Sequence, residues 1–187
     1  QGSSQVVDIS NYAEIATTGN AIEYGSLTQA RGSFQAVSNN SRGVFIAGYT
    51  NDVVTAGTYE NTIDYYTISS SANATDFGDT LADKYSVIAA DDSSRAVFGG
   101  GRINDNSNVD NMEYFSIGTI SNAVELTQAR RDGAGASNGP RGIFAGGFAT
   151  AASDTVDYVT IGVAGMDAID FGNLSAGRWG VAALSGT

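Results

Sequence analysis

Four positively charged residues recur along this sequence, each after a short step rich in Leu and Thr. They are Arg31, Lys84, Arg130 and Arg178. Placed around a central channel, such side chains could bind an anionic ligand, because guanidinium and ammonium groups form strong hydrogen bonds with oxyanions. The alternative is structural, with each cation holding a turn through backbone carbonyls or through Asp and Glu side chains. Regular recurrence favours the structural role, since a function is rarely repeated in every copy of a structural unit.

Four acidic residues recur with the same regularity, namely Glu23, Asp76, Glu125 and Asp170. Two carboxylates about 5–10 Å apart could hydrolyse a glycosidic bond. The recurrence of these acids indicates instead that they satisfy turns or pair with the cations.

The segment 104–110 is rich in Asn and Asp. It could bind Ca²⁺, which prefers about six to eight oxygen ligands, but it lacks the ordered acid spacing and distal glutamate of a calcium loop. The preferred interpretation is an Asx-rich loop between blades.

Composition excludes several chemistries. The chain has no cysteine and no histidine, so disulfides, thiolate metal sites and Ser-His triads are ruled out. It carries 9 Lys and Arg against 20 Asp and Glu, with no basic cluster, which makes nucleic acid a poor partner. No apolar run approaches the ~20 residues that cross a bilayer. We therefore expect no catalytic residue, no metal site, no cofactor, no nucleic-acid partner and no membrane insertion.

A longer repeat surrounds the cations. In the first three copies a second arginine follows 11 residues later and opens the sequences R-G-V-F, R-A-V-F and R-G-I-F, at Arg42, Arg95 and Arg141. Within one copy, residues 63–68, 74–77, 85–90 and 95–101 have the β-branched, aromatic and small residues of short strands, with a turn over 69–73. Four short strands per repeat predict an all-β propeller blade.

The repeats extend over about 6–55, 56–107, 108–154 and 155–187, and together form one repeat domain over 6–187. Residues 1–5 are expected to be a linker or a tag remnant. A fourth R-G-V-F strand would begin near position 178 + 11 = 189, beyond Thr187. We therefore expect about four blades of four short antiparallel strands. The last blade would be incomplete, or closed by the N-terminal strand or a partner chain.

The order of residues in each copy resembles a kelch-type repeat. In the second copy it runs through Asp64-Tyr65, Phe77, Lys84, the small-residue strand 87–90 and Val97-Phe98-Gly99-Gly100. The chain departs from the family pattern where phenylalanine replaces the usual tryptophan, where lysine replaces arginine, and where the third copy lacks its aromatic residue. The resemblance implies a β-propeller with a binding or scaffolding role, because kelch domains of this kind are enzymes only when they also carry a metal site. Copper-radical oxidation of the galactose-oxidase type is ruled out, since it needs His and Cys ligands.

The sequence motifs N-A-x-D-F-G and R-G-V-F-x-G-G are similar to those of kelch-like repeats in marine bacteriophage tail-fibre and structural proteins. That resemblance implies a virion or extracellular location. The leading hypothesis is a non-catalytic binding module of a virion fibre or surface protein that contacts a host glycan or protein. The alternative is a structural virion module that docks on other subunits, or on further copies as a homo-oligomer, through its open blade.

The residue after each repeat cation varies, being Gly32, Tyr85, Arg131 or Trp179. Variation at a fixed structural position indicates an end of the propeller where specificity lies. We expect ligand contacts from Trp179, Tyr85 and Arg131, with Tyr49 and Asp52 on the following long loop as a second group. Trp179 could stack on a sugar face, or could instead plug the channel or pack between blades.

Overall fold

The computed structural model describes residues 6–50, 58–104, 106–116, 119–163 and 165–183. In this part of the chain the regular secondary structure is entirely β, with fifteen strands in four antiparallel sheets. The described residues accordingly include no helix that could span a membrane. The prediction of an all-β protein is confirmed.

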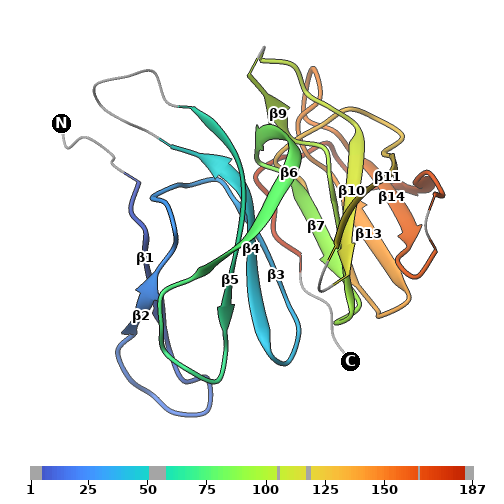
Figure 1. The fold of residues 1–187 in the computed structure, drawn as a ribbon. Helices are drawn as coiled ribbons and strands as arrows, with labels where there is room; N and C mark the ends of the chain where they lie inside the picture. Colours follow the sequence, from blue (N-terminus) through green and yellow to red (C-terminus); the bar gives the residue numbers. More distant parts are fainter. Residues whose placement is uncertain (1–5, 51–57, 105, 117–118, 164, 184–187) are drawn as a thin grey trace.

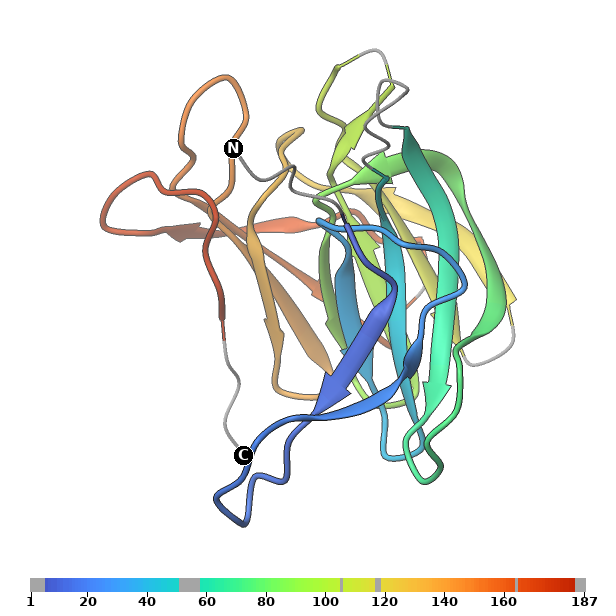
Figure 2. The ribbon, with the colours of Figure 1, turned by 90° about the vertical axis from the view of Figure 1, so that its left-hand side faces the viewer.

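Apart from the short strand β9 (Arg102–Ile103), which joins the second sheet, the four sheets follow one another along the chain, and Figures 1 and 2 show them side by side. The first sheet contains only β1 (Ile9–Tyr12) and β2 (Ile22–Ser26). The second has the order β3 (Gln35–Ser38), β4 (Arg42–Tyr49), β5 (Tyr59–Thr67), β6 (Thr75–Tyr85) and β9 (Arg102–Ile103). The third has the order β7 (Ile88–Asp91), β8 (Arg95–Gly99), β10 (Asn111–Ser116) and β11 (Thr119–Glu125). The fourth has the order β12 (Ala134–Ser137), β13 (Arg141–Ala145), β14 (Thr155–Thr160) and β15 (Ile169–Asn173).

Each of the three larger sheets combines parts of two successive sequence repeats. Its first two strands are the small-residue strand and the R-G/A-x-F strand of one repeat, and its next two open the following repeat. The register recurs as well: the phenylalanine of the first repeat lies opposite the acid of the next, as Phe45 opposite Asp64, Phe98 opposite Glu113 and Phe144 opposite Asp157. A sheet is therefore offset by two strands from a repeat.

The first, second and fourth predicted strands overlap β5, β6 and β8, but each extends one or two residues beyond the observed strand at one end. The third predicted strand, 85–90, is divided in the structure, because β6 ends at Tyr85 and β7 begins at Ile88. Ser86 between them has a left-handed φ of 55°. The Ser86 backbone bonds to Ser33 and Asp132, far away in the sequence, and local strand propensity does not reveal such contacts.

Equivalent positions share this left-handed conformation, each two residues after a repeat cation. They are Ser33, Ser86, Asp132 and Gly180, with φ values of 53°, 55°, 56° and 63°. The amide of each of the last three donates to the carbonyl oxygen of the one before it, at 2.9, 3.1 and 2.9 Å in chain order. This run of hydrogen bonds joins the sheets near the points where their inner strands begin.

The apolar core lies in layers between the sheets. One cluster, which includes Ile46, Ile63 and Phe98, fills the space between the second and third sheets. Another, which includes Met112 and Phe144, fills the space between the third and fourth. The innermost strands β3, β7 and β12 contact one another in that order. Sheet faces buried on both sides in this way are consistent with the layered packing of a repeat protein.

Candidate functional site

Three of the four repeat cations are buried between sheets, each against an acid of the following sheet. The pairs are Arg31–Asp64 at 2.8 Å, Lys84–Glu113 at 2.5 Å and Arg130–Asp157 at 2.8 Å, with all six side chains 0% exposed. The short aspartates are paired with the long arginines, and the one lysine, which is shorter, is paired with the one glutamate, which is longer. An ion pair of similar total length thus occupies each of the three junctions, as Arg–Asp in two of them and as Lys–Glu in the third.

In the Arg130–Asp157 pair the other hydrogen-bonding groups are engaged as well. Arg130 donates Nε to Gly146 O and Nη2 to Phe144 O, both at 2.9 Å. The Asp157 carboxylate accepts from Thr127 N at 3.2 Å and from Thr127 Oγ1 at 2.5 Å. The structural role of the repeat cations is therefore confirmed for these three residues, because their donors are engaged by carbonyls and acids inside the protein.

The repeat acids have a different role from the buried acids. Asp76 and Asp170 accept hydrogen bonds from Gly78 N and Gly172 N, at 2.9 and 2.8 Å, and so satisfy turns as expected. The idea that these acids pair with the repeat cations is wrong for the three buried cations. Those cations bind the acids that precede the strand tyrosines, since only those face the neighbouring sheet.

The second set of repeat arginines stacks on tyrosines of the adjacent strand. Arg42, Arg95 and Arg141 lie 4.1, 4.9 and 4.4 Å from the ring centroids of Tyr65, Tyr114 and Tyr158. Each arginine is a diagonal neighbour of its tyrosine, because the residue two positions after it lies opposite that ring. These cations therefore contribute to packing within a sheet.

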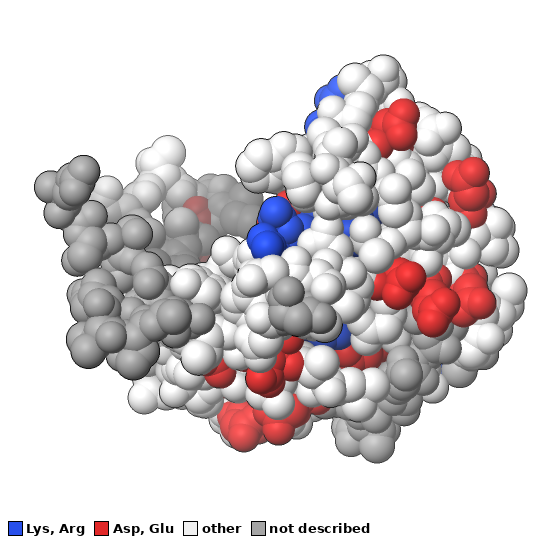
Figure 3. All heavy atoms as spheres, turned by 90° about the horizontal axis from the view of Figure 1, so that it is seen from above, with Lys and Arg blue, Asp and Glu red and all other residues white. Residues whose placement is uncertain are grey.

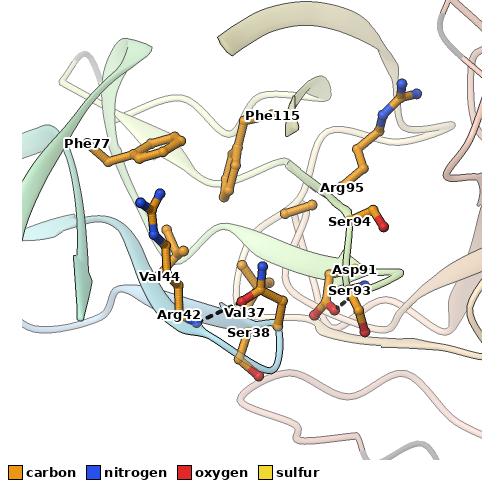
Figure 4. Close-up of a pocket in the computed structure, with 12 residues that line it drawn as sticks. Val37, Ser38, Arg42, Val44, Phe77, Asp91, Ser93, Ser94, Arg95 and Phe115 are labelled. Carbon is orange, nitrogen blue, oxygen red and sulfur yellow. Dashed lines mark hydrogen bonds between the residues drawn. The ribbon is translucent and has the colours of Figure 1, made fainter. Parts of the chain in front are cut away.

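Beside two of these arginines lies a small apolar cavity between the second and third sheets. Figure 4 shows the rings of Phe77 and Phe115 above it, with Arg42 and Arg95 at its sides. Its volume of about 30 Å³ is close to that of one water molecule. It is a packing gap at a junction and is too small for an organic ligand.

A larger cavity of about 920 Å³ lies between the inner strands β3, β7 and β12. Its described walls carry mainly backbone, Ala, Ser, Asn and Asp, and none of the repeat cations lines it. The hypothesis of a central channel ringed by repeat cations is therefore not supported for Arg31, Lys84 and Arg130.

At one end of the sheets three tyrosines form a cluster, hereafter the tyrosine cluster. Tyr59 lies 4.7 Å from Tyr85 and 5.8 Å from Tyr49 between ring centroids, and Tyr49 lies 5.9 Å from Tyr85. The Tyr59 hydroxyl donates to Asn106 Oδ1 at 2.9 Å. Burial, aided by the neighbouring Tyr85 phenol, raises the pKa of Tyr59, so this hydroxyl stays protonated at neutral pH.

A cavity of about 470 Å³ adjoins the tyrosine cluster, hereafter the arginine cavity. It is lined by Arg102, Arg131, Asn106, Asn108, Gln128 and Phe148, with Ala and Thr residues completing it. Tyr85 pairs with Arg102 across two strands, which connects the cluster to the cavity. Figure 3 looks down on this end and shows Lys and Arg atoms near its middle, with Asp and Glu atoms toward the edge.

Phe148 connects two of the expected ligand-binding residues. The Arg131 guanidinium lies 4.9 Å from the Phe148 ring centroid, and Trp179 meets the same ring edge-on at 6.0 Å. Trp179 is 58% exposed, so much of its indole ring faces solvent. The structure thus brings Arg131 and Trp179 together around one phenylalanine.

The structure places four of the five expected ligand-binding residues in the tyrosine cluster or beside Phe148. Tyr49 and Tyr85 meet through Tyr59, while Asp52 lies outside the described residues. Sequence reasoning missed Tyr59, Arg102 and Phe148. Strand register could have indicated the last two. Arg102 lies opposite Tyr85 and Phe148 lies opposite Arg131, and both Tyr85 and Arg131 are variable residues that follow a repeat cation.

The described part of the Asx-rich segment binds the protein's own groups. Asn104 donates to Asp83, and Asn108 donates to the carbonyl oxygens of Phe148 and Ala149 at 2.8 and 2.9 Å. These bonds anchor the loop to Asp83 on β6 and to the segment around Phe148, which lines the arginine cavity.

No family model and no curated protein matches the sequence. Among solved structures the chain is similar to YjhT, with a TM-score of 0.71 and 10% sequence identity over 88% of this chain and 62% of YjhT. The chain thus spans about three fifths of the length of YjhT. At this identity the likeness bears on fold alone, and it supports a β-propeller-like all-β architecture.

Proposed function

We propose that the chain is a non-catalytic, kelch-like binding module that contacts a glycan through the tyrosine cluster and the arginine cavity. The observation that carries this proposal is the gathering, at one end of successive sheets, of aromatic rings and arginines around a cavity of about 470 Å³. Partly exposed aromatic rings offer apolar faces to sugar rings, and arginine and amide side chains bind hydroxyl groups. The resemblance of its sequence motifs to phage tail-fibre repeats supports a location on a virion surface and a host glycan as the ligand.

The first prediction concerns aromatic side chains of this end. Replacing Tyr85 or Trp179 with alanine should weaken glycan binding by about 5–10-fold, the loss of about 1–1.5 kcal/mol of ring contact. Binding would be found on a glycan array and quantified by titration calorimetry. The matched control is Phe171→Ala, since Phe171 is also 58% exposed but lies on β15 outside the site. Unchanged affinity in both site variants would contradict the proposed location.

A second candidate function is assembly through the open end of the sheet series. The side chain of Arg178, the fourth repeat cation, is exposed and, among the described residues, donates only to neighbours in its own turn, to Ala176 O at 3.3 Å and to Ser175 Oγ at 3.4 Å. At the other end, β1 pairs only with β2 within the described residues, although its counterparts β5, β10 and β14 are paired on both sides. Unpaired strand edges invite pairing with another chain.

The register shows how such assembly can be tested. Asn11 lies opposite Glu23 as Asp64 lies opposite Asp76, so Asn11 occupies the position of the buried acids. If the two ends meet between copies, Asn11→Asp should strengthen concentration-dependent association, because it gives Arg178 a carboxylate, and Arg178→Glu should reverse that gain. Analytical ultracentrifugation of the full chain measures both. A monomer at all concentrations, in wild type and in both variants, would exclude assembly by this route.

A further inference from the structure

The nine Lys and Arg residues of the chain fall into groups with distinct surroundings. Three lie in buried ion pairs between sheets, three stack on tyrosines, and Arg178 lies at the open end. The last two, Arg102 and Arg131, both line the arginine cavity. Apart from Arg178, the two cations that neither form a buried ion pair between sheets nor stack on a tyrosine therefore both lie at this cavity.

The acids are distributed in the opposite way. The chain carries 20 Asp and Glu residues, yet none of the described residues that line the arginine cavity is acidic. Arg102 donates Nε to Asn106 O at 3.1 Å and forms no ion pair with a described carboxylate. Arg131 forms an ion pair with Asp132 through Nη1, while its buried Nε has no partner within the described residues. The two guanidinium groups retain donors for a ligand.

We infer that the arginine cavity binds the carboxylate of an acidic sugar, with Arg102 and Arg131 as its cationic partners. This inference rests on the proposed function and specifies its ligand class. Planar guanidinium groups match the two oxygens of a carboxylate, and such charge-assisted hydrogen bonds are stronger than those to neutral hydroxyls. The Arg131 guanidinium lies over the Phe148 ring, in a cation–π contact that favours this position of the side chain.

The neighbouring side chains suit the rest of such a ligand. Asn106 links the cavity to Tyr59, so the tyrosine cluster lies within one side chain of Arg102. A sugar whose carboxylate meets the arginines can therefore place its ring near the phenols. The net charge of −11 does not prevent binding, because charges farther than about 8 Å are largely screened at physiological ionic strength.

The test compares an acid with its own neutral derivative. We expect sodium D-galacturonate to bind the full chain about tenfold more tightly than the methyl ester of D-galacturonic acid, measured by ligand-observed NMR, since esterification neutralises the carboxylate and adds only one methyl group. Raised salt should reduce the preference. Arg102→Gln and Arg131→Gln should each abolish it, whereas Arg102→Lys should retain part. The matched control is Arg141→Gln, since Arg141 stacks on Tyr158 at the start of β13, outside the cavity.

The outcomes separate this inference from the proposed function. Equal binding of acid and ester would overturn the inference and leave glycan binding in place. A preference for the acid that survives both glutamine variants would also overturn it, because the charge would be recognised elsewhere. Binding of neither compound, together with a blank glycan array, would remove both proposals. Circular dichroism of each variant identifies any loss that comes from unfolding.

Discussion

Replacing Arg130 with methionine is expected to lower the free energy of unfolding by about 3–5 kcal/mol. The substitution leaves the Asp157 carboxylate, which is 0% exposed, without its positive partner between two sheets. It also removes the donors to Gly146 O and Phe144 O. Because domains of this kind are stable by about 5–15 kcal/mol, the change is a large fraction of the total. Urea unfolding followed by circular dichroism measures it.

Two further variants identify the cause of this loss. Arg178→Met changes the same side chain at the unpaired end, where the guanidinium is exposed, and should alter stability by no more than about 0.5 kcal/mol. The double variant Arg130→Met with Asp157→Leu should recover part of the loss, since no unpaired charge stays buried. Equal losses at positions 130 and 178 would show that the ion pair is not what stabilises the junction.

Replacing Gly135 with alanine should be the most damaging addition of a single methyl group to the inner strands. A Cβ at this position would lie 1.9 Å from the carbonyl oxygen of Ala89 on the neighbouring sheet. The obstacle is backbone, so β7 and β12 must separate to relieve it. Overpacking of a core costs about 1–3 kcal/mol and occasionally more, and we expect this variant at or above the upper value.

The control for this prediction is Gly162→Ala, where a Cβ would meet nothing within 4 Å. That variant should change stability by less than about 0.5 kcal/mol. Thermal unfolding of the two variants in parallel provides the comparison. If Gly135→Ala were as stable as Gly162→Ala, the close approach of β7 and β12 would be wrong.

Taken together, these predictions distinguish two uses of the same repeated residues. The first three cations and the close-packed glycines hold neighbouring sheets together, whereas the residues that follow the cations differ from copy to copy and reach the end of the sheets. Stability and ligand binding should therefore respond to different substitutions. Arg130→Met should destabilise the chain without a specific effect on glycan binding, whereas Tyr85→Ala should weaken glycan binding with little effect on stability.

Several features of the fold follow from the sequence alone. Short runs of β-branched and aromatic residues between Asx- and Gly-rich turns predicted an all-β chain, because the period and length of such runs are local properties. The equal 11-residue spacing from one repeat cation to the next arginine predicted units of one kind. The glycines after Val97-Phe98 indicated close approach of neighbouring units, and a Cβ at Gly100 would indeed lie 2.3 Å from Arg130 O.

Only the tertiary structure decided which residues meet. Arg31 pairs with Asp64, 33 positions away, rather than with the repeat acid Glu23, because the sheet that follows turns its acid toward the junction. In the same way Arg102 reaches the cavity from β9, a two-residue strand added to the edge of the second sheet. The local sequence determines where strands and turns form. Which residues pair between neighbouring sheets depends on the two-strand offset between each sheet and its sequence repeat, and that offset arises only when successive sheets pack together.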